Sequence, residues 1–291
     1  MHALFRPAIA LMNRLNYTRK FLILGVAVIG VMLVLLFTVY TNLKRDIETA
    51  HEEMAGLQML KPTNRMVQTM QQHRGLSSGV LNGNEAMKDK RAAKEKEVAD
   101  ALLATDAALS PKLRETAAWK DIRQDWEAIR GGGLSWSPPD NLKRHSAMIA
   151  KVLDFMVDVA DETSLTLDPE MDTYYFMDTV VTKMPAMLEP LGIARARGTG
   201  VLSRKELTPQ LRIDISSLVA QMASTLHAQN GNLDKVVRIV PGLQGSLSGP
   251  AKEFSAGVEK IFALIRDDIL AEKFATAPQD YFAQTTGIID L

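Results

Sequence analysis

An uninterrupted apolar stretch near the N-terminus dominates the hydrophobic pattern of the chain. Residues 21–43 carry no charged side chain, and residues 21–41 read FLILGVAVIGVMLVLLFTVYT. A helix of this length spans the hydrocarbon core of a bilayer, which is about 30 Å thick. A cleaved signal peptide is the alternative, but its apolar core holds only about 7–15 residues before a small-residue cleavage site. The sequence TNLKRDIE that follows offers no such site. We therefore predict an uncleaved transmembrane helix over residues 21–41.

The charges on either side of this stretch predict the direction in which the helix crosses the membrane. The twenty residues before it contain cations and no acid: Arg6, Arg14, Arg19 and Lys20. After it, two cations are outweighed by four acids: Lys44 and Arg45 against Asp46, Glu48, Glu52 and Glu53. Because lysine and arginine accumulate on the cytoplasmic side, we predict a cytoplasmic leader over residues 1–20. The chain is then expected to cross the bacterial inner membrane once and to place its bulk in the periplasm.

Beyond the apolar stretch, the pattern is helical. Apolar residues recur at alternating intervals of four and three, at Leu43, Ile47, Ala50, Met54 and Leu57, so the membrane helix is predicted to continue outward. Cap and turn residues predict the later helix boundaries: Asn82-Gly83-Asn84 with Asn84 as N-cap, Ser110-Pro111, the loop 131–139 with Asp140 opening the next helix, Asp168-Pro169, Thr208-Pro209, Gly245–Pro250 and Ala277-Pro278. No segment alternates apolar and polar residues as a strand does, so the predicted fold class is all-α.

One internal repeat suggests how these helices are grouped. Residues 74–81 (RGLSSGVL) align without gaps to residues 195–202 (RARGTGVL), and both copies lie near the end of a long predicted helix. Their offset equals the length of one predicted four-helix unit. We therefore predict two duplicated four-helix bundles, at residues 42–167 and 168–291, with the last helix truncated. The alternative is that the two segments are similar by chance or because small residues let helices pack closely.

Composition and charge exclude several classes of function. The 34 basic and 34 acidic residues balance, so no overall field draws the chain toward nucleic acid. Cysteine is absent, which excludes disulfide scaffolds and thiolate metal sites. Glu48 and His51 have the spacing of a di-metal carboxylate bundle but lack a second pair. The acids Asp154, Asp158 and Glu162 favour a solvated helix face over a cation site. Phosphate-loop and catalytic motifs are missing, so we predict no enzyme, no catalytic or metal-binding residue and no cofactor.

The repeated arginines are the candidate ligand-binding residues. Arginine presents a rigid fork of donors that fits a carboxylate, nitrate or phosphate with two parallel hydrogen bonds. Small neighbours leave room beside that fork, so the predicted site consists of Arg74, Ser77, Ser78, Arg195 and Arg197. Arg195 and Arg197 lie about 200° apart on a helix, so only one of them is expected to face the pocket. The alternative, which residue chemistry alone favours, is that each arginine pairs with an acid at a bundle rim.

Three segments resemble known sensor proteins. The leader at residues 15–24 (LNYTRKFLIL) resembles the start of many bacterial chemoreceptors. Residues 71–79 (QQHRGLSSG) resemble the arginine-bearing helix of NIT (nitrate- and nitrite-sensing) domains, with His73 where paired arginines often stand. Residues 168–178 (DPEMDTYYFMD), together with Pro185 and Leu191-Gly192, resemble the second half of sensor regions in methyl-accepting chemotaxis proteins, histidine kinases and diguanylate cyclases.

This resemblance implies a ligand held between helices of two stacked bundles, in NIT proteins by arginines. We therefore expect the sensing region of a membrane signal-transduction receptor, most simply a methyl-accepting chemotaxis protein fragment that senses a small anion or metabolite and pairs as a homodimer. A histidine kinase or diguanylate cyclase sensor is the first alternative, and a membrane-tethered scaffold for a protein partner is the second. Such receptors continue into a second membrane helix and a signalling region, so a truncated receptor is expected here.

Overall fold

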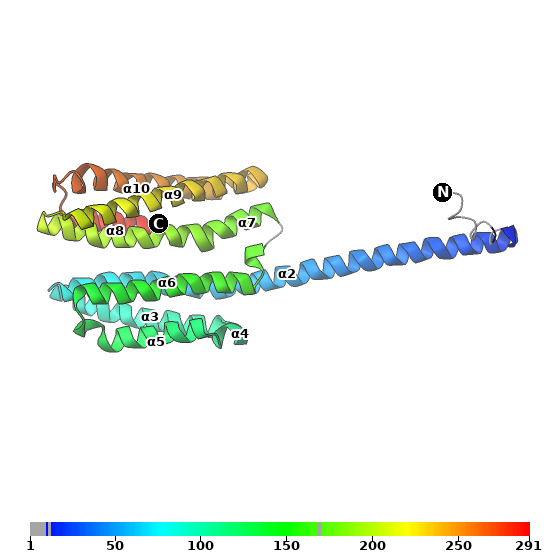
Figure 1. The fold of residues 1–291 in the computed structure, drawn as a ribbon, viewed down its shortest axis with the longest axis horizontal. Helices are drawn as coiled ribbons and strands as arrows, with labels where there is room; N and C mark the ends of the chain where they lie inside the picture. The colour runs from blue at the N-terminus through cyan, green and yellow to red at the C-terminus, as the bar shows by residue number, and fades with distance from the viewer. Residues whose placement is uncertain (1–9, 11–12, 168–169) are drawn as a thin grey trace. The chain divides into compact units, whose positions relative to one another are not determined.

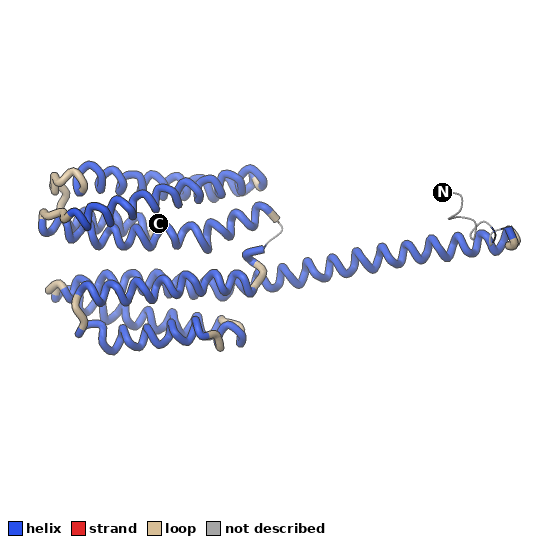
Figure 2. Tube along the Cα trace, in the orientation of Figure 1, coloured by secondary structure: helices blue, strands red, loops and turns tan. Residues whose placement is uncertain are grey.

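The computed structural model describes residue 10, residues 13–167 and residues 170–291. The described residues form helices and short connecting turns, with no strand among them (Figure 2), which confirms the all-α prediction. Arg6 of the predicted leader and the Asp168-Pro169 helix start lie outside the described residues. By its contacts the chain divides into two compact units, residues 1–52 and residues 53–291.

One helix, α2 (Tyr17–Leu81), contains both the apolar stretch and the first arginine motif. Among the helices of the described residues, it is the one that is long and apolar enough to cross a membrane. Its most apolar window has a mean hydropathy of 3.0. None of that window is buried; for example, Phe37 is 69% exposed. Exposed apolar side chains of this kind are stable in the hydrocarbon core of a bilayer. The helix ends at Leu81, as the Asn-Gly-Asn turn predicted.

Within the second unit, the C-terminal part of α2 lies beside the next four helices (Figure 1), and together they enclose one hydrophobic cluster. These helices are α3 (Lys88–Ala108), α4 (Pro111–Arg114), α5 (Ala117–Gly132) and α6 (Pro138–Glu162). Trp119 and Phe155 stack at its centre, with ring centroids 5.3 Å apart. Met177 and Val181, which follow α6 in the chain, also belong to this cluster.

A second hydrophobic cluster is formed by the remaining helices. They are α7 (Met171–Met177), a π-helical segment (Asp178–Lys183), α8 (Met184–Arg204), α9 (Pro209–Ile239), α10 (Gln244–Leu264), a second π-helical segment (Ile265–Ile269) and α11 (Pro278–Ile289). Tyr281 of α11 is fully buried, and its hydroxyl donates to the carbonyl of Ala194 at 3.0 Å. A Cβ at Gly198 would come within 2.6 Å of the Tyr281 ring, so this glycine lets α8 and α11 pack closely.

Local cap chemistry explains where several of these helices begin. The hydroxyls of Ser110 and Thr208 accept from the backbone N–H groups three residues later, at 3.2 and 3.3 Å, as predicted. Helix α6 begins at Pro138 instead of Asp140, because Ser137 provides the cap and proline suits the first helical position.

The expected break at residues 245–250 is also wrong, since these residues lie inside α10. The chain turns earlier, at a 3-10 turn over Pro241–Leu243. Val240, with φ −120° and ψ 81°, leaves the helical conformation there, and the residue before a proline is disfavoured in that conformation. Pro250 removes only one helical hydrogen bond and is tolerated.

Candidate anion-binding site

Arg74 lies buried where α2, α6 and α8 meet, with its side chain 4% exposed. Its Nη1 donates to Ser146 Oγ at 2.8 Å and to Glu189 Oε1, and its Nη2 donates to Glu189 Oε2 at 3.0 Å. Gln71, one turn earlier on α2, donates to the same Oε2 at 2.9 Å. The guanidinium fork of Arg74 is therefore closed by a two-oxygen carboxylate.

Arg195 on α8 is also buried, at 6% exposure. Its Nη1 donates to Thr286 Oγ1 on α11 at 2.7 Å, and its Cζ lies 4.7 Å from the ring centroid of Phe282. Among the described residues, Thr286 is the one hydrogen-bond acceptor of the Arg195 side chain. In contrast to Arg74, Arg195 faces a hydroxyl and an aromatic ring.

Contacts at two glycines show that both guanidinium groups lie between α2 and α8. A Cβ at Gly192 of α8 would come within 3.1 Å of Arg74 Nη2. A Cβ at Gly75 of α2 would come within 3.6 Å of Arg195 Nη2. Each guanidinium thus lies against a glycine of the other helix, close to the other arginine. Glu189, Gly192 and Arg195 are spaced by three residues, which keeps them along one side of α8.

The charges in this space do not balance. Burial lowers the pKa of Arg195, and the neighbouring positive charge of Arg74 lowers it further; Asp290, Tyr281 and Glu189 act in the opposite direction. Glu189 is already bound to Arg74, and Asp290 is exposed. In the described part of the chain, these two buried guanidinium groups therefore have one hydrogen-bonded carboxylate between them, and it is bound to Arg74. An excess positive charge out of water is costly unless an anion accompanies it.

The other three predicted site residues make their contacts elsewhere. Ser77 is buried and accepts from Arg91 Nε of α3 at 3.1 Å. Arg197 pairs with Asp214 of α9, with Nη1 and Oδ2 2.5 Å apart. Ser78 is half-buried, and its carbonyl accepts from Asn82 at 2.7 Å. The structure thus brings Arg74 and Arg195 together and directs Ser77 and Arg197 toward other helices.

Sequence reasoning missed the residues that surround the two arginines: Gln71, Ser146, Glu189, Gly192, Phe282 and Thr286. Glu189 is separated from Arg74 by 115 positions, and no local pattern signals such a pairing. Among these partner residues, the repeat points only to Gln71 and Gly192, which lie at equivalent positions just before its two copies. The repeat therefore located the arginines but not their partners.

A pair of buried histidines lies beside Arg74. His73 Nδ1 and His145 Nε2 are 3.0 Å apart, and His145 Nδ1 lies 2.8 Å from the carbonyl of Asn141. Since that carbonyl only accepts, Nδ1 of His145 holds its proton, and its Nε2 accepts from His73. Burial is the main reason that the pKa of His73 falls to about 3 and that of His145 to about 4. Both rings are therefore neutral at physiological pH.

The acidic stripe on α6 has a structural role at one end. Glu162 pairs with Lys112 of α4. Burial and the charges of Asp161 and Asp154 raise the pKa of Asp158. Among the described residues, no group of three or more metal-ligating side chains is placed to hold a metal ion.

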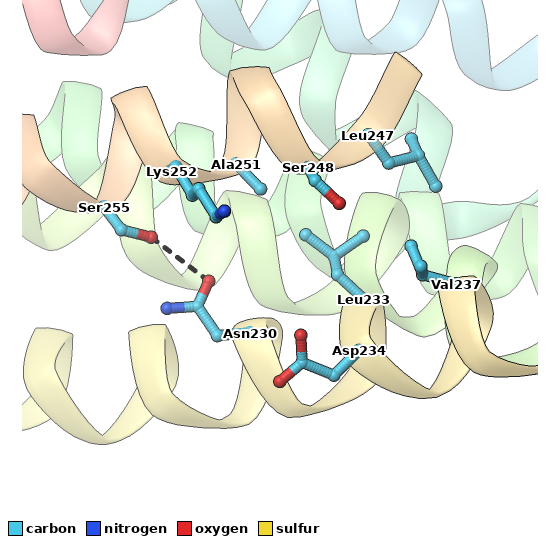
Figure 3. A pocket seen from close by; sticks show the side chains of 9 residues that line it. All are labelled: Asn230, Leu233, Asp234, Val237, Leu247, Ser248, Ala251, Lys252 and Ser255. Atoms are coloured by element: carbon cyan, nitrogen blue, oxygen red, sulfur yellow. Dashed lines mark hydrogen bonds between the residues drawn. The ribbon is translucent and has the colours of Figure 1, made fainter. Parts of the chain in front are cut away.

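A groove of about 310 Å³ lies between α9 and α10 (Figure 3). Leu233 and Val237 face Leu247 and Ala251 across it, and Ser255 donates to Asn230 at 3.1 Å. The charged residues of its lining, Asp234 and Lys252, are exposed. Neither Arg74 nor Arg195 lines this groove, so it is separate from the arginine pair.

Comparison with protein-family models identifies a family for the region that holds the arginine pair. The model described as NIT, nitrate and nitrite sensing, matches residues 65–291, which contain both Arg74 and Arg195. Comparisons with curated proteins and with solved structures found no match. The family match covers well over half of the chain, and it includes residues 71–79, whose sequence resembles that family. The chain therefore belongs to the nitrate and nitrite sensing (NIT) family of sensor domains.

Proposed function

We propose that this chain is the ligand-sensing region of a membrane signal-transduction receptor and that it binds nitrate or nitrite between Arg74 and Arg195. The observation that carries the proposal is the pair of neighbouring buried guanidinium groups of which, within the described residues, only Arg74 is hydrogen-bonded to a carboxylate. A monovalent anion restores the charge balance. Nitrate and nitrite are also planar, with oxygens spaced to accept paired hydrogen bonds from an arginine fork.

Continuity of α2 supports a route from the anion to the membrane. Arg74 lies on the same helix as the candidate membrane span, and Arg195 lies on α8. An anion that binds both arginines favours one position of α8 relative to α2. Shifts of about 1–2 Å between packed helices are typical of such transitions. The chemoreceptor-like leader at residues 15–24 favours a methyl-accepting chemotaxis protein as the receptor class.

Binding of the anions to the full chain in detergent micelles tests this proposal. Nitrate or nitrite at 100 times its dissociation constant is expected to raise the unfolding free energy by about 2.7 kcal/mol, seen as a higher Tm. Chloride and sulfate at equal ionic strength are the controls, because a spherical or divalent anion fits the planar monovalent site poorly. Equal shifts with all four salts would mean a general salt effect.

An exposed apolar seam on α2 supports pairing with a second copy of the chain. Leu43, Ile47, Met54 and Leu57 are 57%, 59%, 65% and 47% exposed, and their spacing is that of a two-stranded coiled coil. Two copies anchored in one membrane lie parallel, which suits this pairing. The cationic leader supports a periplasmic position for the seam and the sensing region.

A cysteine at position 47 tests the seam and the orientation together, because the chain has no native cysteine. Ile47→Cys is expected to form disulfide-linked dimers in intact cells exposed to a membrane-impermeant oxidant. Arg45→Cys is the control, since position 45 lies on the opposite face of the coiled coil. An impermeant maleimide should label Arg45→Cys from outside. Equal cross-linking of both variants would contradict the seam, and absence of labelling would reverse the orientation.

A further inference from the structure

Glu189 makes the contacts to Arg74 that an anion would make. Its Oε1 accepts from Arg74 Nη1, while its Oε2 accepts from Arg74 Nη2 at 3.0 Å and from Gln71 Nε2 at 2.9 Å. The side chain is 13% exposed, so this pair is largely shielded from water. The two carboxylate oxygens have the planar, two-point shape of nitrite or of one edge of nitrate. The fork is therefore occupied by a chemical equivalent of the ligand.

The two arginines differ in how much of their hydrogen-bonding capacity is used. Both Nη atoms of Arg74 donate to Glu189, and Nη1 donates to Ser146 as well. Arg195 donates from Nη1 to Thr286, while its Nη2 lies beside Gly75. An incoming anion consequently meets an available donor group at Arg195 and an occupied one at Arg74. To bind both arginines, it must take the place of the Glu189 carboxylate.

We propose that Glu189 is an internal competitor of the anion: its carboxylate occupies the Arg74 fork in the empty state, and the ligand displaces it. This inference rests on the proposed function of the arginine pair. It makes Glu189 the residue that sets the anion concentration at which the sensor responds. It also links binding to movement, because Glu189 belongs to α8 and its release frees α8 from one ion pair with α2.

Displacement also predicts which anions are recognised. A ligand that replaces a carboxylate must offer two oxygens in one plane to the two Nη atoms of Arg74, as nitrite, nitrate and formate do. Chloride offers a single acceptor atom and cannot form the two parallel bonds that the carboxylate makes. The class of ligand is therefore a small planar oxyanion of charge −1.

Three variants of the full chain separate displacement from a simple charge effect, with nitrate affinity measured by calorimetry. Glu189→Gln keeps the shape of the side chain and removes the competing charge, so at least tenfold tighter binding is expected. Asp290→Asn removes an acid that also influences Arg195 but does not touch Arg74. It is the matched control, with a change below about threefold expected from its exposure.

Glu189→Asp completes the set, because it keeps the charge and shortens the reach by one methylene. Displacement predicts tighter nitrate binding for this variant, whereas a pure charge effect predicts no change. Equal affinities of the wild type and both Glu189 variants would overturn the competitor role and leave the proposed function intact. Absence of nitrate and nitrite binding in the wild type and in Glu189→Gln would instead refute the proposed function itself.

Discussion

At pH 5 the chain is expected to be about 4 kcal/mol less stable toward unfolding than at pH 8, because two buried histidines cannot take up protons in the folded state. The ordinary histidine pKa is 6.5, whereas the folded pKa is about 3 for His73 and about 4 for His145. Above pH 6.5 neither state binds these protons. Between pH 6.5 and about 4 only the unfolded chain binds them, so stability falls as the pH falls. Each histidine therefore lowers the free energy of unfolding by about 2 kcal/mol at pH 5.

The surroundings of the histidines oppose protonation. Arg91 lowers the pKa of both rings, and Arg74 also lowers that of His145. Glu95 is the nearby acid, with its Oε2 3.9 Å from His73 Nε2, but it already pairs with Arg91 at 2.9 Å. Unfolding free energies at pH 8 and pH 5 measure the effect. The double variant His73→Gln/His145→Asn is expected to lose most of the pH dependence, whereas His227→Gln, at an exposed position, should keep it. A wild-type change below about 1 kcal/mol would contradict this account.

The two arginines are expected to differ sharply in their effect on stability. Arg74→Ala removes one half of a buried ion pair and leaves the Glu189 carboxylate with Gln71 as its donor. Loss of one partner from a buried pair costs about 3–5 kcal/mol. Arg195→Ala removes a charge with no hydrogen-bonded acid among the described residues. Its lost bond to Thr286 is offset by relief of that buried charge, so its cost should stay within about 1 kcal/mol.

Urea unfolding of the anion-free chain, followed by circular dichroism, checks this difference. The control is the double variant Arg74→Met/Glu189→Leu, which replaces the whole ion pair by apolar side chains and should recover most of the stability lost in Arg74→Ala. If Arg195→Ala destabilises the chain as much as Arg74→Ala, the excess positive charge at the site is ruled out.

The helices could be predicted from sequence because their boundaries depend on local chemistry. Ser110 and Thr208 cap the helices that follow them, and each cap involves residues only three positions apart. The errors arose where two signals compete. Ser137 and Asp140 are both good caps, and Pro138 decided between them. The glycines and Pro250 suggested a break, but the non-helical residue before Pro241 had already turned the chain.

The candidate site was predictable only in part, because its residues come from distant segments. The repeat identified Arg74 and Arg195, and helix geometry separated Arg195 from Arg197, which pairs with Asp214. Glu189 and His145 were not found, since their partners lie 115 and 72 positions away. Such pairings depend on how helices pack, and packing is decided by the whole core. For the same reason, the sequence could not identify the acid that pairs with Arg74, because Glu189 lies on a distant helix.

Nitrate binding to the full chain, measured by calorimetry for the wild type, Arg195→Ala and Arg197→Ala, tests whether the arginine pair holds the anion. Arg195 faces Arg74 across the two glycines, whereas Arg197 pairs with Asp214. Loss of a hydrogen bond to a charged group costs about 1.5–3 kcal/mol, which corresponds to an affinity loss of about 10- to 150-fold. We predict this loss for Arg195→Ala and an affinity near that of the wild type for Arg197→Ala. Equal affinities of all three proteins for nitrate would contradict it.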